Sequence, residues 1–334
     1  MANRSPQEFD SSWILNARGP KNQVKPGQPY LALLEKELGN SGEIQTTGTI
    51  FLTNRECPFR CLMCDLWKNT TEDSVSPREL LQQINFGLEQ FQSECRHLNL
   101  NSVVQQLKLY NSGNFFDRRA IPRQTLPEIA KRINSQFAGL KKSNLVIENH
   151  PKLTGASCLD FAQQIDCELE IAMGLETVHP EILPRLNKEM TLSDFCRATE
   201  LLIHNSIQVR AFILLRTPFM SETEGIEWAL KSIEYAYSIG VNCCSIIPTR
   251  RGNGAIDQLE KIGLFSEPSL TSLETVMETG LNCTLPGQRL FVDLWDLRRF
   301  SKCSDCFQER FSRLERINFS QTNEPRVRCE RCDS

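Results

Sequence analysis

The feature of this sequence that most limits its fold is an alternation of short apolar runs with longer helical patterns, from about residue 48 to about residue 250. Runs rich in β-branched residues predict strands, and apolar residues three or four positions apart predict helices. Strands and helices that alternate in this way form parallel sheets with right-handed crossovers. Six units of this kind predict an α/β fold, a partial (β/α)6 TIM-type barrel rather than the closed barrel of eight. The predicted strands are residues 48–53, 104–110, 144–148, 168–173, 208–215 and 242–247.

Capping residues mark where several of the intervening helices begin. Ser76, Thr125 and Ser221 each lie three residues before a glutamate, which is the spacing of a capping box. Proline directly follows Ser76, at the first helical position, where proline is favoured. Thr191 with Asp194 is a weaker form of the same signal.

The sequence divides into four segments. Residues 1–46 are polar and broken by prolines, and we expect an extension that covers the domain and forms one short helix near residues 30–38. Residues 47–250 hold the predicted barrel, and residues 251–300 extend it at its C-terminal side. Residues 301–334 form a cysteine-containing tail.

Composition excludes several classes of protein. Hydrophobic residues make up 40% and charged residues 24% of the chain, which is typical of a globular protein rather than a disordered one. The net charge of −3 gives no global positive field that would attract nucleic acid. The N-terminus lacks an apolar stretch suited to a signal peptide, and the sequence has no apolar run of about 18 residues. We therefore expect a cytoplasmic protein without a membrane span.

Fourteen cysteines are many for a chain without an export signal, so we expect reduced thiols that bind metal rather than disulfides. Seven of them lie in tight groups with short spacings. The other seven are scattered, and we expect them to be small buried side chains. These are Cys95, Cys158, Cys167, Cys196, Cys243, Cys244 and Cys283.

The first group of cysteines directly follows the first predicted strand. Cys57, Cys61 and Cys64 are separated by three and then two residues, and three such thiolates can bind three irons of a [4Fe–4S] cluster. The fourth iron then lacks a protein ligand and is open to the amino and carboxylate groups of S-adenosylmethionine (SAM). A zinc site or a chance cluster of cysteines is the alternative, but a structural zinc site usually takes four protein ligands. The motif and its place after a strand therefore favour a cluster that splits SAM reductively.

Polar residues also follow the other predicted strands. In a βα barrel the loops after the strands gather at one end and carry the chemistry, so we expect these segments and the cysteine loop to share one mouth. His150 and His179 could act as proton donors, but a lone histidine in a loop is more often merely exposed, and we interpret both in that way. The polar segments are Asn111-Ser112-Gly113-Asn114, Glu148-Asn149-His150, Gly174-Leu175-Glu176-Thr177, Arg216-Thr217-Pro218 and Pro248-Thr249-Arg250.

The three-cysteine motif is the signature of the radical SAM superfamily, which the chain resembles over about residues 47–250. Met63 departs from the aromatic residue that this superfamily often places beside the third cysteine. Residues 174–187 resemble the subgroup that contains the elongator acetyltransferase, the tRNA methylthiotransferases and coproporphyrinogen oxidase-like enzymes. Residues 109–117 and 212–222 look closest to the radical SAM subunit of archaeosine synthase, which acts on a modified deazaguanine base in tRNA.

The resemblance implies cofactor contacts after the second strand. Asn111, Ser112 and Gly113 correspond to the glycine-rich element whose backbone carbonyls receive the amino group of SAM, and glycine permits that close approach. A plain turn is the alternative. The resemblance also implies a flavodoxin- or ferredoxin-type protein as electron donor.

Charged residues at the other strand ends are further candidates. Glu148 and Glu176 would contact the ribose hydroxyls of SAM or the substrate, the alternative being a solvated carboxylate. Arg210 or Arg216 would pair with the SAM carboxylate, because arginine suits bidentate recognition. A surface ion pair is the alternative for either arginine.

The tail carries a second metal signal. Cys303 and Cys306 form one pair, and Cys329 and Cys332 form another after 22 intervening residues. Two such pairs predict a four-thiolate site with sulfurs about 3.5–4 Å apart. The chain between the pairs must then fold back, so we expect the return segment up to Arg328 to close over a helix at residues 307–317. Zinc is the first choice, with an auxiliary iron–sulfur cluster or disulfides as alternatives. Acidic and basic residues nearly balance in the tail, which favours a solvated helix face over a ridge that binds RNA.

Three functions are compatible with these features. The favoured one is a radical SAM enzyme that modifies a nucleoside in tRNA. A radical SAM enzyme acting on a free small molecule is the second, and the near-neutral charge supports it. The third is a non-catalytic iron–sulfur or zinc protein, which would not need an open iron inside a barrel. The sequence identifies no catalytic residue beyond the cofactor ligands.

Overall fold

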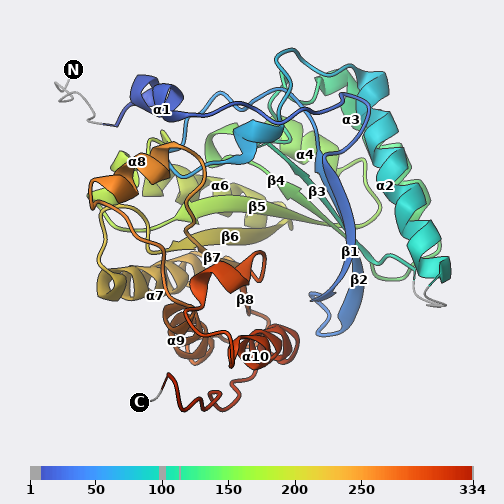
Figure 1. Ribbon diagram of the computed structural model, residues 1–334. Coiled ribbons are helices and arrows are strands. Elements are labelled where there is room, and N and C mark those ends of the chain that lie inside the picture. The colour runs from blue at the N-terminus through green and yellow to red at the C-terminus, as the bar shows by residue number, and fades with distance from the viewer. Residues whose placement is uncertain (1–8, 98–102, 113, 333–334) are drawn as a thin grey trace.

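Eight strands form one sheet in the order in which they occur along the chain (Figure 1). The computed structural model describes residues 9–97, 103–112 and 114–332. The strands are β1 (Leu31–Leu38), β2 (Ile44–Leu52), β3 (Gln106–Asn111), β4 (Asn144–Glu148), β5 (Glu168–Glu176), β6 (Gln208–Leu215), β7 (Cys243–Pro248) and β8 (Arg289–Val292). β1 is antiparallel to β2, and every later pair of neighbours is parallel. The sheet curls into a half-barrel, so the predicted α/β partial barrel is confirmed, with β2 to β7 as its six expected strands.

Helices cover the outer face of the curled sheet (Figure 1). They are α1 (Ser11–Ala17), α2 (Pro77–His97), α3 (Leu126–Phe137), α4 (Ala156–Ala162), α5 (Ile182–Arg185), α6 (Leu192–His204), α7 (Glu222–Ser238), α8 (Ala255–Lys261), α9 (Leu270–Leu281) and α10 (Phe307–Ser320). Short 3₁₀ turns are η1 (Leu66–Asn69), η2 (Arg123–Thr125), η3 (Pro151–Leu153) and η4 (Leu297–Phe300). Within the described ranges, each helix is too short or too polar to cross a bilayer.

Three of the four predicted capping signals are confirmed. Glu79 and Ser76 exchange side-chain and backbone hydrogen bonds at the start of α2. Thr191 and Ser221 form reciprocal capping boxes at the starts of α6 and α7. The prediction for Thr125 is wrong, because η2 runs directly into α3 and leaves Thr125 in a helical conformation without a capping hydrogen bond.

Strand β1 replaces the short helix that we predicted near residues 30–38, so that prediction is wrong. Its sequence is rich in leucine, glutamate and lysine and suits a helix by intrinsic propensity. In the fold, Glu35 and Glu37 face the interior and accept hydrogen bonds from Lys108 at 2.8 and 2.6 Å. Ala32 and Leu34 pack on the opposite side, against the core. Pairing with β2 and a buried ionic partner thus override local propensity.

A buried ionic layer fills the half-barrel near the amino ends of its strands. Arg210 pairs with Glu37 at 2.7 Å and with one oxygen of Glu170, and Arg289 pairs with the other oxygen of Glu170 at 2.8 Å. Glu170 is fully buried, and Lys108 and both arginines are nearly so. Each charge has a partner, as burial of charge requires.

The free edge of β8 is covered by α10 rather than by another strand. The side-chain amide of Asn318 accepts from the N–H of Val292 at 3.0 Å and donates to its carbonyl at 2.9 Å. Gln321 makes the same two bonds with Leu290, at 2.7 and 2.9 Å. The two amides take the place of a further strand and protect an edge that would otherwise pair with another chain.

Replacing both Asn318 and Gln321 by alanine is expected to expose this edge. Each lost hydrogen bond should cost about 1 kcal/mol of unfolding free energy, and the bare edge should promote self-association. Chemical denaturation and light scattering would measure the two effects. Alanine at Gln308, an exposed residue of the same helix, is the matched control. A double variant that stays as stable and as dispersed as this control would contradict the role given to the two amides.

The scattered cysteines only partly follow the prediction of burial. Four are buried, namely Cys95, Cys158, Cys243 and Cys244. Cys167 and Cys196 are half-buried. Cys283 is exposed, so the prediction is wrong there, because this residue lies just beyond the end of α9.

Candidate active site and metal centre

The loops that follow the parallel strands meet at one edge of the half-barrel. The cysteine loop follows β2, and Asn111 ends β3 beside it. Asn114, in the loop after β3, donates a hydrogen bond to Sγ of Cys57 at 2.8 Å. Glu148 ends β4 and Glu176 ends β5, on the two neighbouring strands. Convergence of these loops at one mouth is thus confirmed for the described residues. Gly113, which we predicted as part of this site, lies outside them.

Side-chain amides from distant segments hold the cysteine loop in place. Asn187 donates to the carbonyl of Arg60 at 2.7 Å. Asn253, after β7, donates to the carbonyls of Leu62 at 2.8 Å and Cys64 at 3.2 Å. These bonds satisfy backbone acceptors that a loop cannot pair internally. The shape of the loop therefore depends on residues far away along the chain.

His150 joins the cysteine loop to the loop after β5. Its ring stacks on Phe59 with centroids 3.9 Å apart and an angle of 18° between the planes. Nδ1 accepts from the backbone N–H of Lys152, so Nε2 carries the hydrogen and donates to the carbonyl of Lys188 at 3.0 Å. Burial, together with the Lys188 charge, lowers the pKa of His150 to about 3, so the ring is neutral. The interpretation of His150 as an exposed loop residue is wrong, because the side chain is only 5% exposed. His179 is half-buried, and its Nδ1 accepts backbone N–H groups at the start of α5.

Lys188 is the residue of the mouth that sequence reasoning missed. Its ammonium is buried and pairs with Glu176, which has left-handed backbone torsions at the end of β5. Burial alone would lower the pKa of Lys188, but the charge of Glu176 and the nearby Cys61 more than offset it and raise that pKa. A Cβ at Gly174 would lie 2.1 Å from Oε1 of Glu176 and 2.2 Å from Nζ of Lys188, so a side chain there would displace this pair. Lys188 directly follows Asn187, the last residue of the stretch that resembles the elongator subgroup. This position next to a resembling motif was the sequence signal that could have identified Lys188.

The pKa values of the acidic groups at the mouth are shifted by burial. Burial raises the pKa of Cys57 and Cys61 to about 12, and it also raises that of Cys64. Burial raises the pKa of Glu148 to about 7, against the lowering effect of the Lys188 charge. Thiols in this state bind iron only as a metal replaces their protons, which is how thiolate ligands are normally formed.

Several polar side chains around the mouth are buried but lack a hydrogen-bond partner for at least one atom among the described residues. Buried polar atoms rarely stay unpaired, so a mouth with this set of atoms suits a polar ligand. Asn111 is only 1% exposed, and neither atom of its side-chain amide has a partner. The set comprises Thr53, Asn111, Ser112, Asn149 and Thr249.

The two predicted arginines lie in different places. Arg210 belongs to the ionic layer at the amino ends of the strands, where Glu37 and Glu170 occupy its guanidinium. The prediction that Arg210 binds a ligand at the mouth is therefore wrong, because strand β6 carries it to the other end. Arg216 lies just beyond the carboxyl end of β6 and donates to Glu222 at 3.0 Å and to the carbonyl of Glu267 at 2.9 Å.

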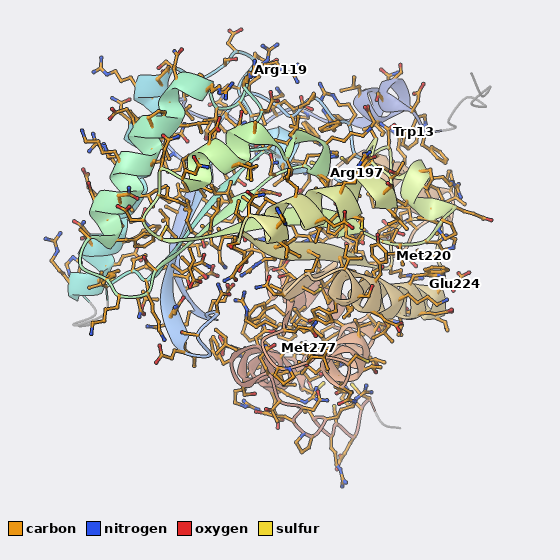
Figure 2. The ribbon with its side chains drawn as sticks, turned by 180° about the vertical axis from the view of Figure 1, so that it is seen from behind. Trp13, Arg119, Arg197, Met220, Glu224 and Met277 are labelled. Carbon is orange, nitrogen blue, oxygen red and sulfur yellow. The ribbon has the colours of Figure 1, made fainter. Side chains whose placement is uncertain are left out.

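The N-terminal segment packs over the outer side of the cysteine loop. Arg18 pairs with Glu56 at 2.7 Å and lies over the ring of Trp67, 4.7 Å from its centroid. Leu62, between the second and third cysteines, is fully buried in an apolar cluster with residues of this segment and of α8. Figure 2 shows Trp13 of this segment on the same side of the molecule as Met220, just before α7.

The tail forms a four-sulfur site of the predicted size. Sγ of Cys303 and Cys329 lie 3.8 Å apart, and those of Cys306 and Cys332 lie 3.7 Å apart. All four sulfurs lie within 4.8 Å of one another, which fits a tetrahedral metal with bonds of about 2.3 Å. Backbone N–H groups of Cys306 and Asp305 lower the pKa of Cys303 to about 7, which favours the thiolate.

Ion pairs anchor the tail to α9. Arg313 is only 1% exposed and donates to Glu278 at 2.5 Å and to the carbonyl of Pro325 at 2.8 Å. Arg310 pairs with Glu274. Further pairs, such as Arg331 with Asp305 and Arg316 with Glu324, neutralise most of the remaining charge and support the predicted mixed face over a basic ridge. In Figure 1 the tail, which includes α10, lies at the bottom of the molecule beside α9, away from α1 and α8, which pack on the cysteine loop.

Replacing Cys329 by alanine is expected to release most of the tail metal and to lower the melting temperature. Cys306 directly precedes α10 at its N-cap, so loss of the fourth ligand frees the start of the helix that covers β8. SAM cleavage without substrate should persist, because the tail lies apart from the cysteine loop. Elemental analysis of protein that also lacks the Cys57 triad would identify the metal as zinc or iron. Alanine at Cys196 is the control, and an unchanged metal content in the Cys329 variant would rule the site out.

No protein-family model matches the chain. An uncharacterized protein of Methanocaldococcus jannaschii is 26% identical over 243 residues, covering 71% of this chain and 65% of that protein. The archaeosine synthase subunit beta of Methanosarcina acetivorans is 24% identical over 271 residues, covering 76% of this chain and 73% of that protein. The subunit of the same name from Thermococcus kodakarensis is 29% identical over 131 residues, or 38% of this chain and 39% of that protein. The chain thus spans less than two thirds of the first of these relatives.

Among solved structures, the Elp3 protein of Methanocaldococcus infernus, lacking its N-terminal residues 1–46, has a similar fold. The TM-score is 0.53 at 15% sequence identity, with 74% of this chain and 61% of that chain covered. At this identity the likeness concerns the fold alone. It confirms the fold implied by the resemblance of residues 174–187 to the elongator subgroup.

Proposed function

We propose that this chain, which has the fold of the radical SAM superfamily, is a [4Fe–4S]-dependent enzyme that cleaves SAM and modifies a nucleoside in tRNA. A cluster with bound SAM supplies a 5′-deoxyadenosyl radical, which removes a hydrogen atom from an unactivated carbon. The observation that carries the proposal is a triad of thiols at the mouth of a half-barrel, among buried polar atoms that lack partners in the described structure. The triad is Cys57, Cys61 and Cys64.

The thiol triad fits a cluster better than a single ion. The tail brings four sulfurs within 4.8 Å of one another, whereas the triad offers three thiols. A structural ion usually takes four protein ligands, but three thiolates suit three irons of a cluster and leave the fourth iron open to SAM. Cys57, Cys61 and Cys64 would each bind one iron, with Asn114 hydrogen-bonded to the sulfur of Cys57.

Lys188 is the best candidate for the cation that binds the SAM carboxylate. Its ammonium is buried, and its charge lowers the pKa of both Cys57 and Cys61 against the larger raising effect of burial. Glu176 holds this ammonium in place and remains a candidate for the ribose hydroxyls. Backbone groups of Asn111 and Ser112 would receive the SAM amino group, as the resemblance implies.

The proposal that the substrate is a nucleoside rests on sequence similarity. Two relatives are named archaeosine synthase subunit beta, and archaeosine is a nucleoside by name. A flavodoxin- or ferredoxin-type protein would supply the electron. A free small molecule is the second candidate substrate, because the net charge of −3 and the paired arginines of the tail do not favour RNA phosphates.

Anaerobic reconstitution with iron and sulfide, followed by SAM and dithionite, tests the proposal. The expected products are methionine and 5′-deoxyadenosine, with an absorption spectrum typical of [4Fe–4S] clusters. Adding bulk tRNA should increase the yield, and the tRNA complex should weaken as salt increases. Cleavage of SAM without any effect of tRNA would favour the small molecule. Absence of both cluster and cleavage would rule out the enzyme.

A further inference from the structure

The interior of the half-barrel is arranged in layers. Successive residues of a strand face opposite sides, so one set packs against the helices and the other faces the interior. Lys108, Arg210 and Arg289 face inward and lie in the buried ionic layer described above. On β3 and β6, two residues farther toward the mouth, the inward side chains are Tyr110 and Phe212. The layer above the charges is therefore aromatic.

Four aromatic rings form a continuous row across this layer, which we call the aromatic floor. Tyr30 lies 5.5 Å from Phe51, Phe51 lies 5.7 Å from Tyr110, and Tyr110 lies 6.2 Å from Phe212, measured between ring centroids. Phe51 is on β2, Tyr110 on β3 and Phe212 on β6, so the row spans the interior from one side to the other. Its last two contacts are edge-to-face, at 69° and 86°.

The rings of the aromatic floor are partly exposed to solvent on the side that faces the mouth. Phe51, Tyr110 and Phe212 are each half-buried, whereas the inward residues beneath them, Lys108 and Arg210, are only 5% and 2% exposed. Solvent therefore reaches the rings from the mouth and not from below. Rings that only filled the core would be fully buried, as the outward-facing residues of the same strands are.

Glu148 supplies a hydrogen-bond acceptor beside the floor. Glu148 faces inward at the end of β4, is half-buried, and its charge acts on both Tyr30 and Tyr110. The cations that face the interior of the described structure are already ion-paired. These are Lys108, Lys188, Arg210, Arg250 and Arg289. A ligand on the floor thus meets flat apolar faces and a carboxylate, and it meets no unpaired positive charge.

We propose that the aromatic floor binds the reacting group of the substrate, and that this group is a flat unsaturated ring whose edge carries N–H donors directed at Glu148. The inference rests on the proposed function, because it places the ring below the mouth where SAM would bind. Aromatic rings prefer flat partners that stack or meet them edge to face. Above the pKa of about 7 that burial gives Glu148, its carboxylate is ionised, so it accepts hydrogen bonds and cannot donate them. A saturated ring would fail the first condition, and a ring without N–H donors would fail the second.

Three small probes of matched size test the two conditions separately. Benzamidine is flat and carries N–H donors, cyclohexanecarboxamidine carries the same donors on a saturated ring, and benzoate is flat without donors. Ligand-detected NMR with the reconstituted protein should show benzamidine bound at least tenfold more tightly than either of the others. Glu148→Gln and Phe212→Leu should each weaken benzamidine about tenfold. The matched controls are Glu234→Gln and Phe86→Leu, which alter exposed residues on outer helices and should change nothing.

Equal binding of benzoate, or benzamidine binding that is insensitive to both interior variants, would overturn the inference. A tenfold loss of SAM affinity in Phe212→Leu would also overturn it, because the floor would then belong to the adenine of SAM. If Phe212→Leu proves unstable, Tyr110→Phe removes only a hydroxyl and should leave the preference for flat probes intact. Failure of SAM cleavage with retained benzamidine binding would count against the proposed function and not against the floor.

Discussion

Alanine at Cys57, Cys61 or Cys64 is expected to abolish SAM cleavage, with at least a thousandfold fall in the rate of 5′-deoxyadenosine formation. Each thiolate would hold one iron of the cluster, and its loss leaves a second iron without a protein ligand. The chromophore near 400 nm, typical of such clusters, should disappear in the same variants. The sulfurs of the tail should keep their own metal, because they lie in a separate four-thiolate site.

Alanine at Cys283 is the matched control, since this cysteine is exposed and belongs to neither site. It should leave iron content, absorbance and cleavage unchanged. Iron and sulfide should be counted per chain in each variant, alongside the rate. Normal cleavage by any one of the three alanine variants would show that the cysteine loop does not hold the reactive cluster.

Methionine at Lys188 is expected to weaken SAM binding by roughly ten- to a hundredfold. A hydrogen bond to a charged group contributes about 1.5–3 kcal/mol, and the charge of the buried Lys188 ammonium acts on both Cys57 and Cys61. Equilibrium binding of SAM to the oxidised cluster measures this directly, without any turnover. The iron content should stay near that of the unchanged protein, because Lys188 is not an iron ligand.

Removing Lys188 alone leaves Glu176 buried without its partner, which destabilises a fold by itself. The double variant Glu176→Gln with Lys188→Met removes both charges and should recover the melting temperature. Its affinity for SAM should stay low. Recovery of SAM affinity together with stability would show that Lys188 acts only as a structural partner of Glu176.

Local patterns were sufficient to predict the barrel because its strands are short apolar runs between well-capped helices. β2 to β7 and the caps at Ser76, Thr191 and Ser221 all follow from residues close together in the sequence. β1 does not, because its leucines and charged residues suit a helix until Lys108 and β2 become its partners. The capping prediction for Thr125 was wrong because the 3₁₀ turn η2 precedes α3 directly and already holds Thr125 in a helical conformation.

Cysteine spacing was enough to predict that the four sulfurs of the tail meet. Two pairs of short spacing limit where four sulfurs can go, and the tail sulfurs meet at 3.7 and 3.8 Å. Cysteine spacing could not predict which residues hold the cysteine loop in place. Asn187, Asn253 and His150 lie far from the loop in sequence, and only the curled sheet brings their side chains to it.

The sequence by itself determined the alternation of strands and helices, the end of the barrel that carries polar loops, and the two cysteine groups. These depend on periodicity and short spacing, which act over a few residues. Only the tertiary structure decided which charge lies at which end of a strand. Arg210 and Arg216 are six residues apart on one strand and its exit, yet one closes the amino end of the barrel and the other borders its mouth. Lys188 became a candidate only when Glu176 and the thiols were seen around it, because the partners of a buried charge come from elsewhere in the chain.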